Sequence, residues 1–475
     1  MSTLKIILKK ELLTAIRNLQ IQLTAGIISI LLLIAGVGGY LNYKTQKEQI
    51  AYAKEEKRQQ WLKQGDKHPH IAAHYGTFVF KPKTGLSFFD FGLDAYTGSS
   101  IYLEAHYQHE FMFRPAQDYG AMIRFGELSI ALVLQILIPL LIIFLCFSSF
   151  TQERENGTLK IIVSQGISFR MLAWGKITAY VILVFAILMP TLLILMAGIF
   201  TRPELVLSSD IFWRTLLILL SYSLYFFIFI GLSVWISSYS GVSGNALLTL
   251  LSVWILFTII IPKTTANTAG NVFPLPSINS YHQEIKQYIE SRIERDPLKD
   301  TLIVNFTNKL LRQYKVDSVA QLPINYEAAC SQVYEDFTNS LHDKHSVELF
   351  NQFVRQNNVS TYASIFNPYL SIRNLSMALS ATDFYTYADF QNEAEKYRRD
   401  LVRQMNFDYR DHSKTGEFYE YKADENLWRS VKDFKYEIPP VKSSMSKYSI
   451  EFLALAFWAL MVSLLVTFWI NKSAI

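Results

Sequence analysis

Two groups of residues in this 475-residue sequence have side chains that could do chemistry. The first group gathers five of the nine histidines into one short stretch: His68, His70, His74, His106 and His109. Imidazole nitrogens are common zinc ligands, so these residues could form a metal site. However, no cysteine accompanies them, and their spacing matches no standard zinc finger. The pattern therefore favours the alternative, in which the histidines form hydrogen bonds within a packed domain.

The second group lies in the charged stretch FTQERENGTLK at 150–160. Gly157 permits a sharp turn, and Thr158 could cap a short helix that runs to Ser164. We expect three apolar side chains of this helix to face a groove: Leu159, Ile162 and Val163. Three charged side chains are expected to project from the preceding end: Glu153, Arg154 and Glu155. A solvated loop without a further role is the alternative.

Several motifs that would indicate an enzyme are missing from the sequence. There is no G-x-x-x-x-G-K-[ST] loop to bind the phosphates of ATP, and Gly175-Lys176 lacks the spacing and the following hydroxyl. G-x-S-x-G, H-E-x-x-H and paired cysteine motifs are also absent. We therefore expect no catalytic residues and no cofactor in this chain.

The elements that position these residues are predicted to be membrane spans. The chain is 51% hydrophobic and only 18% charged, whereas about a quarter of a typical soluble chain is charged. A span requires about 20 apolar residues. Six ranges fit this requirement, with a small-residue hairpin at 237–244 between the fourth and the fifth: 23–41, 128–150, 177–200, 212–236, 245–262 and 449–470. The predicted fold class is a polytopic α-helical membrane protein with six transmembrane helices.

We expect these spans to lack charge at membrane depth. Ion-coupled carriers usually need carboxylates or histidines there, so any transport by this chain would draw its energy from a partner. Four aromatic side chains could line an amphipathic path: Tyr222, Tyr225, Phe226 and Trp235. Alternatively, they face lipid or neighbouring helices.

The distribution of charge predicts the topology. Residues 1–22 form a basic amphipathic segment that is expected to lie on the membrane surface, with the N-terminus in the cytosol. The segments 42–127 and 263–448 are then extracytoplasmic, whereas 151–176 and the C-terminus are cytosolic. The two outer segments carry 34 Lys and Arg and 34 Asp and Glu, so the net charge of +5 lies on the cytosolic side. This small net charge does not indicate a nucleic-acid partner.

The two extracytoplasmic inserts differ in composition. The first, 42–127, begins with a charged helical stretch and continues with Gly, Pro and aromatic residues, which predicts short strands and turns in a mixed α/β segment. The second, 263–448, is predicted to be mainly helical, because apolar residues recur at helical spacing between its prolines. Asp383 and Asp389 are expected to be helix N-caps.

The motif E-R-E-x-G-T-L at 153–159, followed by Lys176 at the head of the next span, resembles the permease subunits of type 2 ATP-binding-cassette (ABC) transporters, which have the type V exporter fold. The segment K-E-L-L-x-x-I-R-N at 10–18 resembles the surface helix of that family. The inserts resemble a subgroup with large extracytoplasmic domains, on stretches such as HPHIAAHYG (68–76) and NPYLSIRNLSMALSATDF (367–384). In this family Pro is common at the position of Gly166.

This resemblance implies that 151–176 contains a coupling helix that docks on a separate cytosolic ABC ATPase. The role carries over to six residues: Glu153, Arg154, Glu155, Gly157, Thr158 and Leu159. It also implies that ATP and Mg²⁺ bind to the partner, and that a second copy or a homologous permease completes the pathway in the bacterial cytoplasmic (inner) membrane. The substrate and the direction of transport stay open.

Two other functions are compatible with the sequence. One is a non-transporting scaffold, anchored in the bilayer by six spans, that holds periplasmic or envelope proteins. The other is a membrane metal-handling protein that uses the cluster from His68 to His109.

Overall fold

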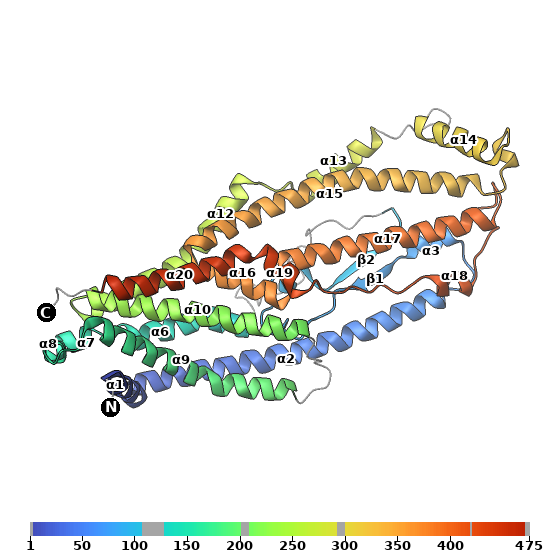
Figure 1. Cartoon of the computed structure of the whole chain (residues 1–475). Coiled ribbons are helices and arrows are strands. Elements are labelled where there is room, and N and C mark those ends of the chain that lie inside the picture. Colours follow the sequence, from blue (N-terminus) through green and yellow to red (C-terminus); the bar gives the residue numbers. More distant parts are fainter. Residues whose placement is uncertain (1–2, 107–127, 201–208, 292–299, 419, 471–475) are drawn as a thin grey trace.

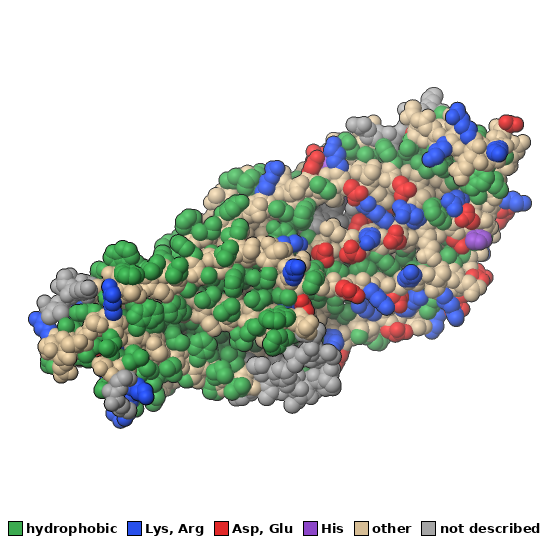
Figure 2. All heavy atoms as spheres, in the orientation of Figure 1, with side chains coloured by type: hydrophobic (Ala, Val, Ile, Leu, Met, Phe, Trp, Pro, Cys, Tyr) green, Lys and Arg blue, Asp and Glu red, His purple; other side chains and the backbone are tan. Residues whose placement is uncertain are grey.

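The chain folds into an elongated, mainly helical molecule (Figure 1). The computed structural model describes residues 3–106, 128–200, 209–291, 300–418 and 420–470. One half of the visible surface is mostly hydrophobic, and the other half carries most of the charged side chains (Figure 2). This division agrees with a membrane-embedded half and a half exposed to water.

Six helices among the described residues are long and apolar enough to cross a membrane, as predicted. Three are single helices: α2 (Leu19–Leu62), α10 (Ser209–Tyr239) and α20 (Ser449–Phe468). Another, α9 (Phe169–Phe200), qualifies over Phe169–Leu193. The remaining two contain a π-helical turn. The second span combines α5 (Ile130–Leu132), η3 (Val133–Leu137), α6 (Ile138–Cys146) and α7 (Thr151–Glu155). The fifth span combines α11 (Ser243–Ile255), η4 (Leu256–Ile260) and α12 (Ile261–Val272).

The predicted hairpin between the fourth and fifth spans is confirmed, because α10 ends at Tyr239 and α11 begins at Ser243. The first span differs from the expectation in length. Helix α2 has 44 residues, which corresponds to about 66 Å at 1.5 Å per residue. It therefore continues without a break from the apolar half far into the charged half (Figure 1).

The prediction that the spans lack charge is wrong at two positions near helix ends. Glu451 in the first turn of α20 is fully buried and accepts a hydrogen bond of 2.8 Å from the Thr361 hydroxyl. Arg214 of α10 is also buried. It pairs with Asp210 at 2.6 Å and donates to the backbone oxygen of Ala378 at 3.0 Å. The burial of Arg214 is compensated by Asp210 and by backbone oxygens, whereas Oε2 of Glu451 has no hydrogen-bond partner among the described residues.

The charged half contains the mixed structure expected for the first insert. Helix α3 (Pro69–Tyr75) leads into β1 (Thr77–Phe80), and the short α4 (Asp94–Thr97) precedes β2 (Ser100–Leu103). The two strands are antiparallel, with Thr77 opposite Leu103.

The described part of the second insert is mainly helical, as expected. Its helices are α13 (Ile278–Glu290), α14 (Thr301–Tyr314), η5 (Val319–Gln321), α15 (Tyr326–Phe366), α16 (Pro368–Ser380), α17 (Phe384–His412), α18 (Glu425–Ser430) and α19 (Val441–Lys447). Asp383 is the N-cap of α17, as predicted, and accepts from the amide of Tyr385 at 3.0 Å. Asp389 is not a cap. It lies inside α17, where it accepts a hydrogen bond from the Tyr436 hydroxyl at 2.9 Å.

Candidate functional site

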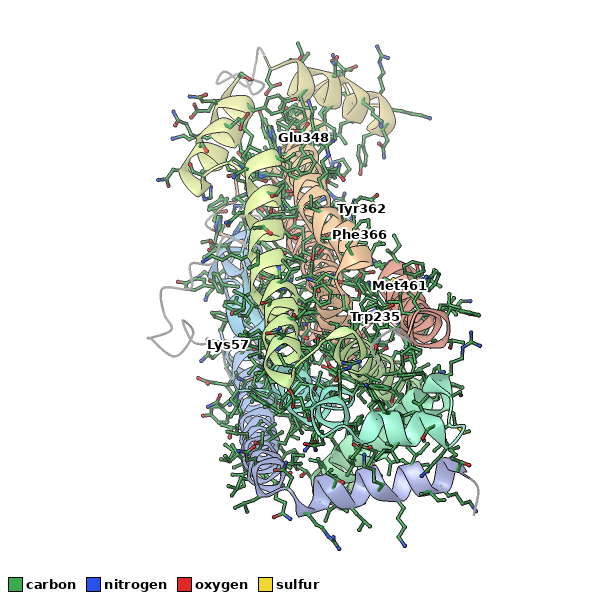
Figure 3. All side chains as sticks on the ribbon, turned by 90° about the vertical axis from the view of Figure 1, so that its left-hand side faces the viewer. Lys57, Trp235, Glu348, Tyr362, Phe366 and Met461 are labelled. Atoms are coloured by element: carbon green, nitrogen blue, oxygen red, sulfur yellow. The ribbon has the colours of Figure 1, made fainter. Side chains whose placement is uncertain are left out.

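Both ends of the described chain lie at the apolar end of the molecule, where α1 (Thr3–Arg17) and α8 (Thr158–Ser164) meet α7 (Figure 1). Figure 3 views the molecule from this end and shows α1 lying across the helical bundle. Asn18 ends α1 and caps α2, because its side chain accepts from the amide of Gln20 at 2.9 Å. The predicted surface helix and the E-R-E-x-G-T-L motif are therefore neighbours.

A buried cluster of charges joins these elements. The ammonium group of Lys176, on α9, lies 2.6 Å from Oε1 of Glu11 on α1 and 2.9 Å from Oε1 of Glu153 on α7. Lys10 bonds to both carboxylates, and the Tyr180 hydroxyl donates to Glu11 at 3.1 Å. Burial alone would raise the pKa of the Glu11 carboxyl, but Lys176 and Lys10 outweigh it and hold this pKa below its ordinary value.

This cluster corrects the expectation for Glu153. The side chain does not project toward a partner: it is buried, because two ammonium groups compensate its charge inside the bundle. Sequence reasoning singled out Lys176 but did not identify its partner Glu11, because the contact joins elements more than 160 residues apart.

The next two charged residues bind the turn between α10 and α11. The guanidinium of Arg154 donates to the backbone oxygens of Ser238, at 2.9 Å, and Ser240. The carboxylate of Glu155 accepts from the amide of Ser243 at 2.6 Å and from its hydroxyl at 3.0 Å. Arg154 thus satisfies free carbonyls at the end of α10, and Glu155 satisfies a free amide at the start of α11.

The predicted turn at Gly157 is confirmed, with a left-handed φ of +72°. Gly157 itself, rather than Thr158, occupies the N-cap position of α8, and the Thr158 hydroxyl instead donates to the backbone oxygen of Glu153 at 3.2 Å. Leu159 is buried, and Ile162 and Val163 pack against the main hydrophobic core, so these three side chains face the body of this chain.

The opposite face of α8 is open to solvent at Lys160 and Ile161, and the Ile161 side chain is 58% exposed. A cavity of about 830 Å³ lies beside α8, between α1, α2, α6 and α7. Its lining includes both Glu153 and Glu155. Helix α7 is therefore held to the bundle by its charged side chains, whereas one face of α8 is exposed.

The aromatic residues predicted to line a path lie in different environments. Tyr222, Tyr225 and Phe226 are buried in the main core. Trp235 is partly buried and donates to the backbone oxygen of Trp469 at 3.3 Å (Figure 3).

Sequence reasoning missed Gln135, a polar residue in the π-helical turn η3. Its amide donates to the Tyr222 hydroxyl at 2.9 Å, and its backbone oxygen accepts from Tyr225 at 2.8 Å. A single glutamine among the apolar residues from Ile130 to Cys146 is the available signal.

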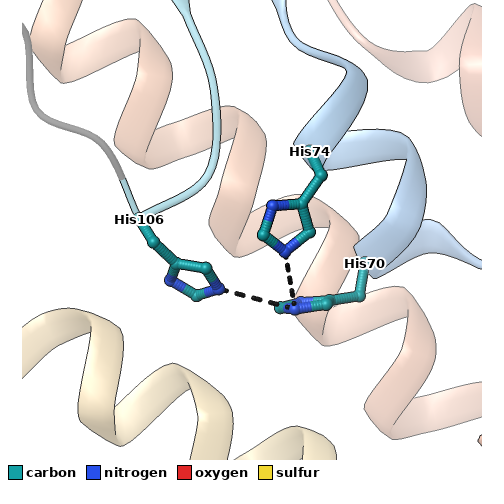
Figure 4. A group of neighbouring side chains, drawn as sticks. All are labelled: His70, His74 and His106. Atoms are coloured by element: carbon teal, nitrogen blue, oxygen red, sulfur yellow. Dashed lines mark hydrogen bonds between the residues drawn. The ribbon is translucent and has the colours of Figure 1, made fainter.

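At the other end of the molecule, three of the five clustered histidines converge (Figure 4). The Nε2 atom of His70 lies 3.2 Å from Nε2 of His74 and 3.5 Å from Nε2 of His106. His68 is separate: it is buried, caps α3 and packs against the rings of Tyr409 and Phe418. His109 lies outside the described residues.

Residues from α15 and α17 contact the Nδ1 atoms of two of these rings, which are the nitrogens that do not converge. Nδ1 of His106 lies 2.7 Å from the carboxylate of Glu335, which also pairs with Arg398 at 2.9 Å. Nδ1 of His70 lies 3.3 Å from Oδ1 of Asn406. No local pattern in the sequence identifies Glu335 or Asn406, because both are more than 200 residues away in the chain.

Burial and electrostatics set the ionisation of this group. Burial lowers the pKa of His70 and that of His74, and the neighbouring His106 contributes to both shifts, so these rings favour the neutral form. Burial opposes ionisation of Glu335, yet hydrogen bonds from His106 and Arg398 lower its pKa to about 2. Neutral imidazoles beside an ionised carboxylate are the states that metal coordination requires.

The six apolar helices indicate a multi-pass membrane protein. A family described as "Domain of unknown function (DUF3526)" matches residues 299–437. This match covers the described segment from α14 to α18, including Glu335 and Asn406, but neither the E-R-E-x-G-T-L motif nor the three converging histidines. No curated protein matches the chain.

Proposed function

We propose that this protein is the permease subunit of an ABC exporter. It lies in the cytoplasmic membrane of a bacterium with both termini in the cytosol, and cytosolic ATPase subunits that bind ATP and Mg²⁺ drive it. Two copies, or one copy and a homologous permease, form the pathway, and this chain hydrolyses no ATP. The proposal rests on the resemblance of the E-R-E-x-G-T-L segment and on the contacts of that segment.

The observation that carries the proposal is how α7 and α8 are attached. Glu153 binds α1 and α9, whereas Arg154 and Glu155 bind the turn between α10 and α11. Leu159 packs into the core below, and the exposed face of α8 points away from it. A force applied to that face therefore reaches the surface helix and several spans through charge-assisted hydrogen bonds, which are short and directional. This is the arrangement that a coupling element needs.

The charge distribution supports the orientation. The basic segment 3–22 and the segment 151–176 lie at the same end as α8, and they carry the excess of Lys and Arg. The opposite half is water-exposed and charge-balanced, as an extracytoplasmic domain can be.

The exposed face of α8 is expected to dock on the ATPase, so we predict that Ile161→Asp abolishes copurification of an ABC ATPase. A carboxylate in an apolar contact would cost several kcal/mol of binding energy unless it found a partner. The measurement is the ratio of ATPase to tagged permease after extraction in a mild detergent. A reduction of more than tenfold is expected from a loss of about 1.4 kcal/mol or more.

The matched control is Val347→Asp, on an equally exposed valine of α15 in the other half of the molecule. This variant should retain the ATPase at the wild-type ratio. The coupling assignment fails if no ABC ATPase copurifies with the wild-type protein in a stoichiometric amount, or if the Ile161→Asp variant retains the ATPase fully. A membrane-anchored scaffold then becomes the better account.

A further inference from the structure

Two of the three separations between the converging nitrogens of His70, His74 and His106 match those around one shared metal ion, and all three ligand atoms lie within 4.8 Å of one another. Zinc binds imidazole at about 2.0–2.1 Å in a tetrahedral arrangement, so two of its nitrogen ligands are about 3.3–3.4 Å apart. The two observed Nε2 separations are 3.2 and 3.5 Å.

The contacts of the outer ring nitrogens determine where the protons lie. A neutral imidazole has one N–H. Nδ1 of His106 faces the Glu335 carboxylate, which only accepts, so the proton of His106 is on Nδ1. The amide of Asn406 donates to Gln332 at 3.0 Å, which leaves its Oδ1 to accept from Nδ1 of His70.

The Nε2 atoms of His106 and His70 face each other across a gap of 3.5 Å. With both rings in the tautomers given above, each Nε2 presents a lone pair to this gap, as a metal ligand does. Nε2 of His74 lies 3.2 Å from the same Nε2 atom of His70. A metal ion between the three rings would accept a lone pair from each of them.

The surrounding chain holds the three rings in place. His70 and His74 are four residues apart on α3, so they share one face of the helix. Gly76 follows with φ +60°, and a Cβ there would approach the backbone oxygen of Leu103 to 2.4 Å, so α3 and β2 lie close together. His106, just after β2, adopts a left-handed φ of +61°, which is unfavourable for a non-glycine residue. Such strain is often retained at functional sites.

We propose that His70, His74 and His106 bind one divalent transition-metal ion, with Zn²⁺ as the best match, and leave a fourth coordination position open. Three imidazoles with a carboxylate that orients one of them form a ligand set that suits this ion. His74 and His106 are exposed, so the open position faces solvent and can take water, a small anion or a donor group of another molecule.

The metal site is independent of the proposed coupling to an ATPase. It lies in the charged half, and its ligands come from α3 and the end of β2, far from α8 (Figure 1). Glu335 and Asn406 lie within the segment matched by the domain family, so that segment supplies the groups that orient the ligands. Loss of metal binding would not contradict the permease assignment, and loss of ATPase binding would not contradict the metal site.

The test is the zinc stoichiometry and affinity of the full-length protein, purified in detergent without a polyhistidine tag. We expect one equivalent of Zn²⁺ by elemental analysis and titration calorimetry, and at least a hundredfold weaker binding in His74→Ala. His106→Asn should have the same effect, since asparagine tolerates the left-handed backbone. The matched control His412→Ala removes an exposed histidine outside the cluster and should bind like wild type.

The role of the outer carboxylate gives a second test. Glu335→Gln should weaken Zn²⁺ binding by about 10–100-fold, because it removes the group that orients His106. Co²⁺ bound in place of Zn²⁺ should show tetrahedral visible absorption bands that shift when azide enters the open position. Absence of stoichiometric zinc binding, or affinity unchanged in both His74→Ala and His106→Asn, would overturn the proposal. A Co²⁺ spectrum insensitive to azide would overturn the open position.

Discussion

Replacing Lys176 by methionine is expected to destabilise the apolar half by about 3–5 kcal/mol. This is the usual cost of removing one partner from a buried ion pair, since the remaining charges lose their compensation. The Lys176 side chain is 1% exposed, and Glu11 and Glu153 both depend on it. Lys10 is half exposed and cannot replace it at the same position.

The measurement is the thermal unfolding midpoint of the variant in one detergent, together with the fraction that elutes as a monodisperse peak. Lys44→Met, at an exposed lysine of α2 with a 3.7 Å contact to Glu48, is the control and should change stability by less than about 1 kcal/mol. Combining Lys176→Met with Glu11→Gln and Glu153→Gln should recover part of the loss, because no buried carboxylate is left unpaired. Equal midpoints for Lys176→Met and Lys44→Met would contradict the buried cluster.

Arg398→Met is expected to destabilise the charged half by a similar amount, about 3–5 kcal/mol. The guanidinium of Arg398 is 2% exposed and pairs with Glu335 at 2.9 Å and with Glu395 at 2.8 Å. It also donates to the side-chain oxygen of Asn339 at 2.7 Å. Its removal leaves Glu335, which is almost fully buried, with His106 as the remaining partner among these contacts.

Arg403→Met on the same helix is the matched control. Arg403 is 45% exposed, and its contacts to Asp336 and Asp400 are 3.4 and 3.8 Å long, so its loss should cost less than about 1 kcal/mol. Both variants can be compared by hydrogen exchange of α15 and α17, which reports local opening. Exchange that is equally slow in the two variants would show that Arg398 does not hold these helices together.

The sequence predicted the elements whose signals are local. Six apolar ranges, the small-residue hairpin before Ser243 and the turn at Gly157 depend on composition or on one residue, and all three agree with the structure. The continuation of α2 to Leu62 is harder to predict, because its first part is apolar in sequence and its second part is charged. Nothing in the two sequence patterns shows that they form one continuous helix.

The sites required contacts between distant segments, which one sequence does not reveal. The sequence predicts that Glu153 projects from the end that precedes α8, yet the ammonium groups of Lys176 and Lys10 compensate its charge and make its burial favourable. The five histidines looked like one group by spacing, but His68 serves as a helix cap while three others converge. Their orienting partners, Glu335 and Asn406, come from a different insert.

The most direct test of the central claim is site-specific photocrosslinking in the native membrane. A photoreactive amino acid at Lys160, on the exposed face of α8, should form a covalent adduct with an ABC ATPase subunit. The same group at Val347 on α15 should form none. An ATPase adduct from position 160 alone is the predicted result. No ATPase adduct from position 160, or equal adducts from both positions, would contradict the assignment of this protein as an ATPase-coupled permease.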